Sequence, residues 1–379
     1  MAVATWVGGD GTGDEQTAFG RGANWSGGVV PDSDDHVIIA NTSHDCRNDA
    51  NRDIASLTIN ESATILGESC VLTILSEGTG SEGTEHFAVN NDGRISGNLD
   101  LIIKTPATTS CDFAGESGHG KFRNVTINHA SCIVNLESTT QFTGDLNITL
   151  GKMVCGGNTV EITGRTDIGP ASGSADQATL QCDASAMYLG SGRTSSFALV
   201  VNQGGTFTGG SGNHTIGSID VKNNSNAKCT LTSANTTING ESVSDNYNLF
   251  VAANGTFAHG SGTVTVTFAD VSFFEKTSGT LALNNLILNH ASANITTNSA
   301  TTVAGDLTIT AGTLSTSGSG NYALTVTGYC DVTGTLTLND STVSVAALRC
   351  KSGAAVTQGS SGTLALATGS NFGGTEGSA

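Results

Sequence analysis

The chain has 379 residues, with 33 acidic against 15 basic side chains and a net charge of -18. No cluster of lysines or arginines offsets this acidity, so a phosphate backbone would be repelled and nucleic-acid binding is not expected. The longest apolar runs are a handful of residues, which is too short to cross a bilayer, so no membrane span is expected.

Residues 1–50 differ in composition from the rest of the chain. They contain both tryptophans, Trp6 and Trp25, and lead into a strand-like segment at 37–39. The first coil of a stacked β-structure exposes apolar surface and unpaired strand edges unless something covers it. We therefore predict that residues 1–50 form an N-terminal cap, with the two indoles covering the end of the stack.

An acidic cluster follows Pro31 within this segment, formed by Asp32, Asp34 and Asp35. Carboxylates that lie close together on a turn can converge on one cation, and oxygen ligands of this kind suit calcium. The preferred interpretation is a solvated turn, with a calcium site as the alternative. No other cofactor and no catalytic residue is expected.

The stretch from 51 to 366 consists of short segments that alternate apolar and polar residues with period two, as in 56–60, 98–101 and 146–149. This alternation is typical of half-buried strands. Gly, Asn, Ser and Asp separate the segments, and these residues suit tight corners. The expected fold is all-β, a single-stranded parallel β-helix or β-solenoid with about 20 to 25 residues in each coil.

An internal repeat lies within this stretch, because residues 125–157 recur without a gap at 286–318 and thirteen aligned positions are identical. Where identity fails, apolar residues often replace apolar residues, which preserves a buried face rather than a chemistry. We expect the matched apolar residues to be buried on strands; the pairs are Val125 and Leu286, Ile127 and Leu288, and Ile148 and Ile309.

The repeat also contains the tetrapeptide Asn-His-Ala-Ser twice. A catalytic residue is normally needed once, so the recurrence favours a structural role at coil corners, where these side chains hydrogen-bond the turn backbone. The residues expected at such corners are Asn128, His129, Asn289 and His290.

The nine cysteines are spread singly, with no CxxC pair, which argues against a zinc site or a thioredoxin-like centre. Several are separated by roughly one coil length. The preferred interpretation is a set of small buried thiols in neighbouring coils. Disulfides between coils are the alternative, and they would indicate an oxidising destination.

The end of the chain, residues 367–379, loses the apolar pattern and is interpreted as a flexible or partner-bound tail. Nothing in the sequence obviously closes the last coils, and an open coil invites another chain. We expect the coils around Val345, Leu348 and 364–366 to be covered by a partner or by a second copy, which predicts a homo-oligomer or attachment to a larger lattice.

The opening segments Trp6-Val7-Gly8-Gly9, 23–32 and 35–39 carry a resemblance. They resemble the entry segment of right-handed β-helix proteins found among bacterial surface adhesins, autotransporter-like passengers and marine phage structural proteins. The remainder of the chain is similar only in its β-solenoid texture. The resemblance implies a right-handed coil, an N-terminal cap and no catalytic residue to transfer.

The functional hypothesis follows from this resemblance. Adhesins usually carry a signal peptide, and the N-terminus lacks a charged region followed by an apolar one. The preferred hypothesis is a non-enzymatic structural or receptor-binding component of an extracellular assembly, a phage fibre, spike or capsid decoration, located in the virion or on an extracellular surface. The alternatives are a secreted adhesin and a polysaccharide lyase or glycoside hydrolase, the latter using paired carboxylates. Glycans are also considered as ligands bound without cleavage.

Overall fold

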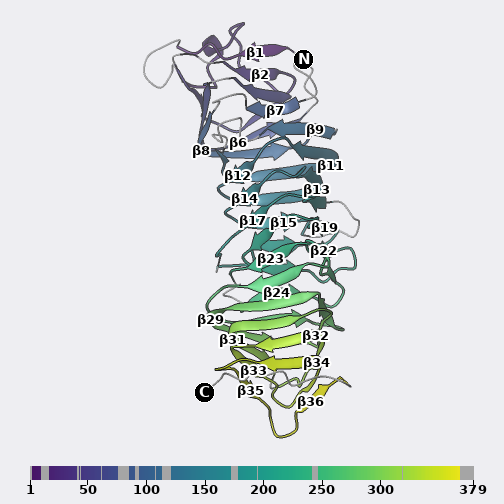
Figure 1. The fold of residues 1–379 in the computed structure, drawn as a ribbon. Coiled ribbons are helices and arrows are strands. Elements are labelled where there is room, and N and C mark those ends of the chain that lie inside the picture. Colours follow the sequence, from purple (N-terminus) through teal and green to yellow (C-terminus); the bar gives the residue numbers. More distant parts are fainter. Residues whose placement is uncertain are drawn as a thin grey trace. The chain divides into compact units, whose positions relative to one another are not determined.

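The computed structural model describes residues 2–9, 17–40, 42, 44–60, 62–75, 85–89, 94–106, 108–112, 121–171, 178–193, 195–240, 246–317 and 319–367. Within these ranges the chain is built of β-strands, with one 3₁₀ turn at Gly22–Asn24 and no α-helix (Figure 1). The all-β prediction is confirmed. Among the same residues, no helix has the length and apolarity that a bilayer crossing requires.

Packing divides the chain into two compact units, each described by itself. Unit 1 comprises Met1–Pro170 and Gln177–Ala186, and unit 2 comprises Ala171–Asp176 and Met187–Ala379. The described strands of unit 1 are β1 (Val3–Thr5), β2 (His36–Ile39), β3 (Cys46–Asn48), β4 (Arg52–Ile54), β5 (Ser56–Ile59), β6 (Thr64–Ile74), β7 (Glu85–Val89), β8 (Arg94–Ile103), β9 (Thr108–Asp112), β10 (Lys121–Phe122), β11 (Val125–Leu136), β12 (Thr140–Phe142), β13 (Leu146–Val154), β14 (Val160–Ile162), β15 (Thr166–Ile168) and β16 (Ala178–Gln181).

Unit 2 continues the same construction. Its described strands are β17 (Met187–Leu189), β18 (Leu199–Val201), β19 (Gly205–Thr208), β20 (His214–Ile216), β21 (Ile219–Val221), β22 (Lys228–Thr230), β23 (Asn235–Ile238), β24 (Tyr247–Val251), β25 (Thr256–Ala258), β26 (Thr263–Val266), β27 (Val271–Lys276), β28 (Leu281–Leu283), β29 (Asn285–Thr297), β30 (Thr301–Val303), β31 (Leu307–Thr316), β32 (Leu324–Val332), β33 (Thr335–Thr337), β34 (Thr342–Cys350), β35 (Ala355–Thr357) and β36 (Thr363–Leu366).

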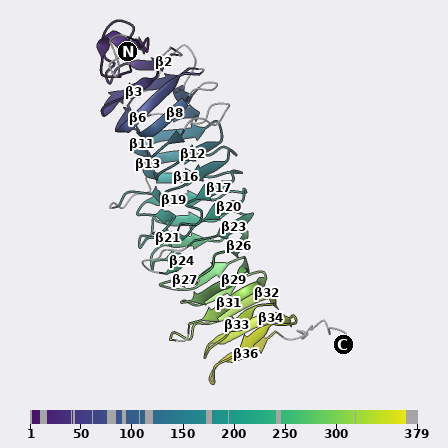
Figure 2. The same ribbon diagram turned by 90° about the vertical axis from the view of Figure 1, so that its left-hand side faces the viewer.

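Every paired strand within each unit runs parallel to its neighbours in the described residues, and the neighbours come from successive coils. In unit 2, β20, β23 and β26 lie side by side in one ladder, and β21, β24 and β27 form another (Figure 2). β18 belongs to the second ladder, since it pairs with β21. This parallel stacking confirms the β-solenoid prediction. Coil length varies, because Ile219 pairs with Leu249, thirty residues on, whereas Leu324 pairs with Val343, nineteen residues on.

The period-two alternation decides which side chains enter the core. In β13, Leu146 and Ile148 are fully buried, while Asn147 between them is half-buried on the outer face. Successive strands repeat this choice in register, so apolar side chains stack on apolar side chains along the inside of each unit. The core of each unit is therefore a continuous column rather than a central cluster.

The two copies of the internal repeat have the same structure. All six matched apolar side chains, from Val125 to Ile309, are fully buried on strands, as predicted. The registers also match, since Val125 pairs with Leu146 and Leu286 pairs with Leu307, and each strand pair has a bulge at the same place. The sequence repeat is thus a repeat of backbone geometry.

The tetrapeptide of each copy lies where one long strand passes from one ladder to the next. In β29 the residues up to Leu288 pair with β26, and the residues from Asn294 pair with β27. The intervening segment bends at a bulge, as β-bulges commonly cause strands to do. The His290 Nδ1 accepts a hydrogen bond of 3.2 Å from the Ser292 backbone N–H, and His129 does the same with Ser131 in β11.

Asn and Asp side chains at the coil corners bind each coil to the next. We call these residues the corner ladder; they are Asp100, Asn124 and Asp145 in unit 1 and Asn285 and Asp306 in unit 2. Each side-chain oxygen accepts the backbone N–H of a residue in the following coil, at distances of 2.7 to 3.2 Å. The coils are therefore joined at their corners as well as along their strands.

Removing one step of the corner ladder should lower stability by a small, defined amount. The Oδ1 of Asp306 accepts the Tyr329 N–H at 2.8 Å, so Asp306→Ala leaves this donor without its partner. We expect Asp306→Ala to reduce the free energy of unfolding by about 1 kcal/mol, the usual value for one hydrogen bond. Asp306→Asn keeps an acceptor and should change it little. Urea unfolding of both variants tests this, and equal losses would contradict the role of the oxygen.

The segment 1–50 begins unit 1, where β1 pairs in parallel with β2. Trp6 and Trp25 are buried and contact each other edge to face, with ring centroids 5.2 Å apart. The Trp25 indole N–H donates to the Phe19 carbonyl at 2.7 Å, and the Trp6 N–H donates to the His44 carbonyl at 3.0 Å. Both indoles thus combine apolar burial with a satisfied donor.

The described cysteines are buried on the inner faces, except for Cys350, which is exposed. Burial raises the pKa of Cys132, Cys229 and Cys330 to about 12, because the thiolate would lose its hydration. Cys46 pairs with Ile65 rather than with another cysteine. The side chain of Cys111 lies outside the described residues. The buried thiols are small core residues, of which Cys70 also donates a hydrogen bond of 2.9 Å to the Asn48 carbonyl. No disulfide joins Cys46, Cys132, Cys229 or Cys330 to a neighbour.

The last described coil differs from those before it. Val345 and Leu348 are buried by the chain's own coils, while Leu364 and Leu366 on β36 are only half-buried. β36 pairs with β34 on one side. Residues 368–379 lie outside the described residues.

Candidate functional site

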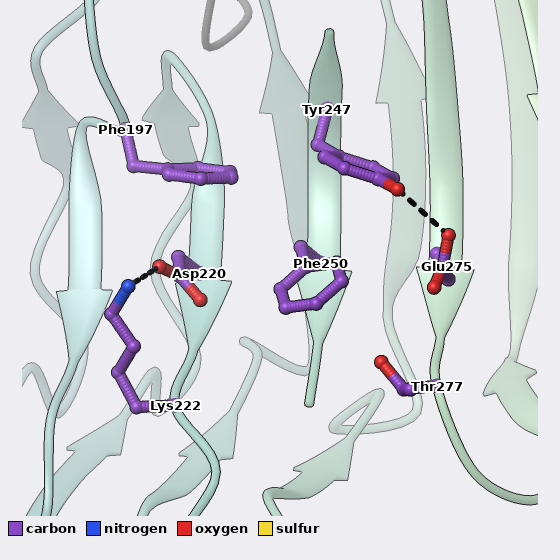
Figure 3. Close-up of a pocket in the computed structure, with 7 residues that line it drawn as sticks. All are labelled: Phe197, Asp220, Lys222, Tyr247, Phe250, Glu275 and Thr277. Carbon is purple, nitrogen blue, oxygen red and sulfur yellow. Dashed lines mark hydrogen bonds and ion pairs between the residues drawn. The ribbon is translucent and has the colours of Figure 1, made fainter. Parts of the chain in front are cut away.

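A groove runs across the outer face of the ladder formed by β18, β21, β24 and β27 in unit 2 (Figure 3). We call it the β24 groove, since strand β24 lies at its middle. Its volume is about 410 Å³, within the range of small-molecule sites. The lining residues are Phe197, Asp220, Lys222, Tyr247, Phe250, Glu275 and Thr277.

Strand register places three of these side chains in one column. Asp220 on β21 pairs with Phe250 on β24, and Phe250 pairs with Glu275 on β27. Because side chains alternate between the two faces of a strand, all three face away from the core. The residues directly before them, Ile219, Leu249 and Phe274, are fully buried. The groove is therefore positioned by the same alternation that builds the core.

Aromatic rings form much of the groove. Tyr247 and Phe250 pack with ring centroids 5.0 Å apart and planes inclined by 50°, and Tyr247 also contacts Phe273 at 5.7 Å. Tyr247 and Phe250 are both half-buried, whereas Phe197 is nearly covered. The groove thus presents partly uncovered aromatic surface on a rigid strand.

Charged side chains lie on both sides of these rings. The Lys222 ammonium forms an ion pair of 2.5 Å with Asp220, whose side chain is only 2% exposed while that of Lys222 is 49% exposed. The Tyr247 hydroxyl donates a hydrogen bond of 2.9 Å to Glu275. Figure 3 shows both contacts bordering the aromatic surface. Counting the three charged side chains, the groove carries one net negative charge.

The three aspartates that sequence analysis considered for calcium lie on the turn before β2. The Asp34 N–H donates to Asp32 Oδ1 at 3.0 Å, and the Asp32 N–H donates to Asp35 Oδ2 at 3.1 Å. Two of the carboxylates therefore stabilise the turn itself. Across the described residues no group of three or more His, Cys, Asp or Glu side chains has an arrangement suited to a metal. The solvated turn stays the preferred interpretation, with calcium binding as the alternative.

Sequence analysis did not identify the β24 groove. Two local signals were available: an acid between apolar neighbours in Ile219-Asp220-Val221, and an aromatic residue at the outward position of Leu249-Phe250-Val251. Neither signal shows that the two side chains share a column, because they are separated by a coil thirty residues long.

Comparison with protein-family models, with curated proteins and with solved structures found no match to this chain.

Proposed function

We propose that this chain is a non-enzymatic structural or receptor-binding component of an extracellular assembly, a phage virion in which it forms a fibre, spike or capsid decoration. The construction of each unit supports the proposal: parallel coils with buried inner faces, joined along their strands and again at the corner ladder. Repetitive scaffolds of this kind present long regular surfaces to partners.

A carbohydrate-cleaving enzyme is the second candidate, because Asp220 and Glu275 occupy one column. Their backbones lie two strand spacings apart, about 10 Å, compared with carboxyl separations of about 6.5 to 9.5 Å in inverting glycosidases. However, Asp220 is almost fully covered and ion-paired with Lys222. A carboxylate held in this way is poorly placed to meet a ligand, so we favour binding over cleavage. A secreted adhesin would use the same binding surface.

Assembly through the end of unit 2 belongs to the same proposal. β36 pairs with β34 on one side, and its leucines are half-buried within the described residues; such a strand suits contact with a second copy or with a lattice. We therefore expect a homo-oligomer or a lattice-bound subunit, not an isolated monomer, in the working assembly.

The virion role predicts that the chain is found in particles. Phage particles would be purified on a density gradient from a host whose phage encodes the chain. Mass spectrometry of the gradient fractions should detect the chain at a constant ratio to the capsid protein. A chain recovered instead from the bacterial outer surface, after cleavage of a precursor, would favour the adhesin. Release of reducing ends from polysaccharides by the purified chain would favour the enzyme.

A further inference from the structure

We propose that the β24 groove binds a neutral carbohydrate, of mono- or disaccharide size within the groove, and does not cleave it. The inference deepens the receptor-binding role and rests on that proposed function, since it names the ligand class that one surface of the scaffold would recognise. It is argued from the rings, the charges and the hydrogen-bonding groups of the groove.

The aromatic surface provides the platform. One face of a sugar ring carries C–H groups with slight positive charge, and the face of an aromatic ring carries the negative part of its quadrupole. Tyr247 and Phe250 are held by packing against each other, and Tyr247 also by Phe273, so their orientation is fixed before a ligand arrives. A preorganised platform loses little conformational entropy on binding.

The polar groups beside the platform match a ligand rich in hydroxyls. Glu275 supplies acceptor oxygens, Lys222 supplies donors and is 49% exposed, and the exposed Thr277 supplies both. A sugar hydroxyl both donates and accepts, so such a mixed rim can bind adjacent hydroxyls of one ring. Polar groups of this number and placement, around a mostly aromatic floor, are typical of specific small-molecule sites.

The charge of the groove selects against anionic ligands. Lys222 and Asp220 balance each other in an ion pair, and Glu275 remains as the net charge. A uronic acid would place its carboxylate near Glu275 in a chain of net charge -18, which is unfavourable. A quaternary ammonium is the other ligand that aromatic clusters bind, and Glu275 would attract its charge. Its ammonium group carries no hydroxyl, however, so it cannot use the Lys222 and Thr277 hydrogen-bonding groups. An uncharged sugar avoids the repulsion by Glu275 and uses these groups.

The test is a binding measurement on the full chain. Calorimetric titration would use neutral hexasaccharides of glucose, galactose, mannose and N-acetylglucosamine, with hexauronates and choline as charged probes. We expect at least one neutral probe to bind, and the uronates and choline to bind at least tenfold more weakly. Phe250→Leu, which keeps an apolar side chain and removes the ring, should weaken the neutral probe about tenfold or more.

Two controls give this result its meaning. Tyr188 on β17 is 43% exposed and lies outside the groove, so Tyr188→Leu removes a comparable surface ring and should leave the affinity within about twofold. Glu275→Gln removes the net charge while keeping hydrogen-bonding capacity, and should strengthen uronate binding relative to the neutral probe. Thermal unfolding of each variant shows that the fold is retained.

The proposal is overturned by any of three results: no neutral probe binds at millimolar concentration, Phe250→Leu and Tyr188→Leu weaken binding equally, or choline binds most tightly. Reducing ends released by the chain and lost in Glu275→Gln would overturn the absence of cleavage. Failure of the virion role is separate, because a chain absent from particles can still bind a sugar, and a virion subunit can fail every sugar probe.

Discussion

Gly312→Ala is expected to destabilise unit 2 by about 3 kcal/mol or more, within the range of severe single substitutions. Gly312 has a φ of +85°, and a Cβ added there would lie 2.6 Å from the backbone oxygens of both Ala293 and His290. Both oxygens belong to the main chain of β29 in the preceding coil, so the backbone of one of the two paired strands would have to move. The close approach, more than the φ value, makes this position intolerant.

Gly279 is a matched control. Its φ of +84° is almost the same, yet a Cβ there would meet nothing within 4 Å. Gly279→Ala should therefore lower stability only by the strain of the left-handed conformation, about 1 to 2 kcal/mol. Urea unfolding followed by circular dichroism measures both. Equal destabilisation would show that the coils do not approach as closely at Gly312 as the structure places them.

The counterpart in the first repeat copy extends the comparison. Gly151 has a φ of +94°, and its added Cβ would lie 2.6 Å from the backbone oxygens of Cys132 and His129. Gly151→Ala should therefore be as damaging as Gly312→Ala. A large effect at one position and a small effect at the other would contradict the structural equivalence of the two repeats.

Acid should destabilise unit 2 through one buried histidine. His214 is 1% exposed, lies in register between Met187 and Thr236, and meets the Phe207 ring edge to face. Burial lowers its pKa from 6.5 to about 4, with a smaller opposing effect from the Gly209 backbone. The folded chain thus resists protonation that the unfolded chain accepts. The contribution of neutral His214 to the free energy of unfolding is fully present above pH 6.5 and is lost as the pH drops towards 4.

The size of this effect follows from the pKa difference. Each pKa unit corresponds to about 1.4 kcal/mol. The shift from 6.5 to about 4 therefore lowers the free energy of unfolding by about 3 kcal/mol once His214 is protonated in both the folded and the unfolded chain. His214→Leu and His214→Gln do not titrate, and both should be less sensitive to pH than the unchanged chain over this interval. Unfolding free energies measured from pH 7 to 4 test the sign. A steeper acid loss in either variant would contradict it.

The fold was predictable because its signals are local and repeated. Alternation such as Leu146-Asn147-Ile148 gave the strands, and the copy of 125–157 at 286–318 gave the stacked architecture. An inward position in one coil faces an inward position in the next, so a local pattern is sufficient to define the core. The sequence also contains a shorter repeat, Gly205-Thr206-Phe207 against Gly255-Thr256-Phe257. Its copies lie on strands two coils apart, since Thr206 pairs with Lys228 and Lys228 pairs with Thr256.

The β24 groove was not predictable in the same way. Its members come from coils of unequal length, and the Tyr247–Leu249 irregularity shifts the register that brings Tyr247 beside Phe273. Loop insertions change the sequence spacing without changing which side chains meet, because chain entropy tolerates longer loops at little cost. Outward residues also carry no periodic apolar pattern. A site assembled from the outer face therefore leaves only isolated signals, such as Asp220 between two apolar residues.

The corner ladder gives each unit a direction. In each of its steps the acceptor belongs to an earlier coil and the donor N–H to a later one, as with Asn124 and Asp145, or Asp306 and Tyr329. During synthesis the side-chain acceptor therefore leaves the ribosome before the backbone N–H that donates to it. At the corners, removing the coils that follow leaves a side-chain oxygen without its donor, and water can solvate it. Removing the coils that precede leaves a main-chain N–H without its acceptor instead. The strand edges lose their partners in both cases, so the difference between the two ends of a unit lies in the corner ladder.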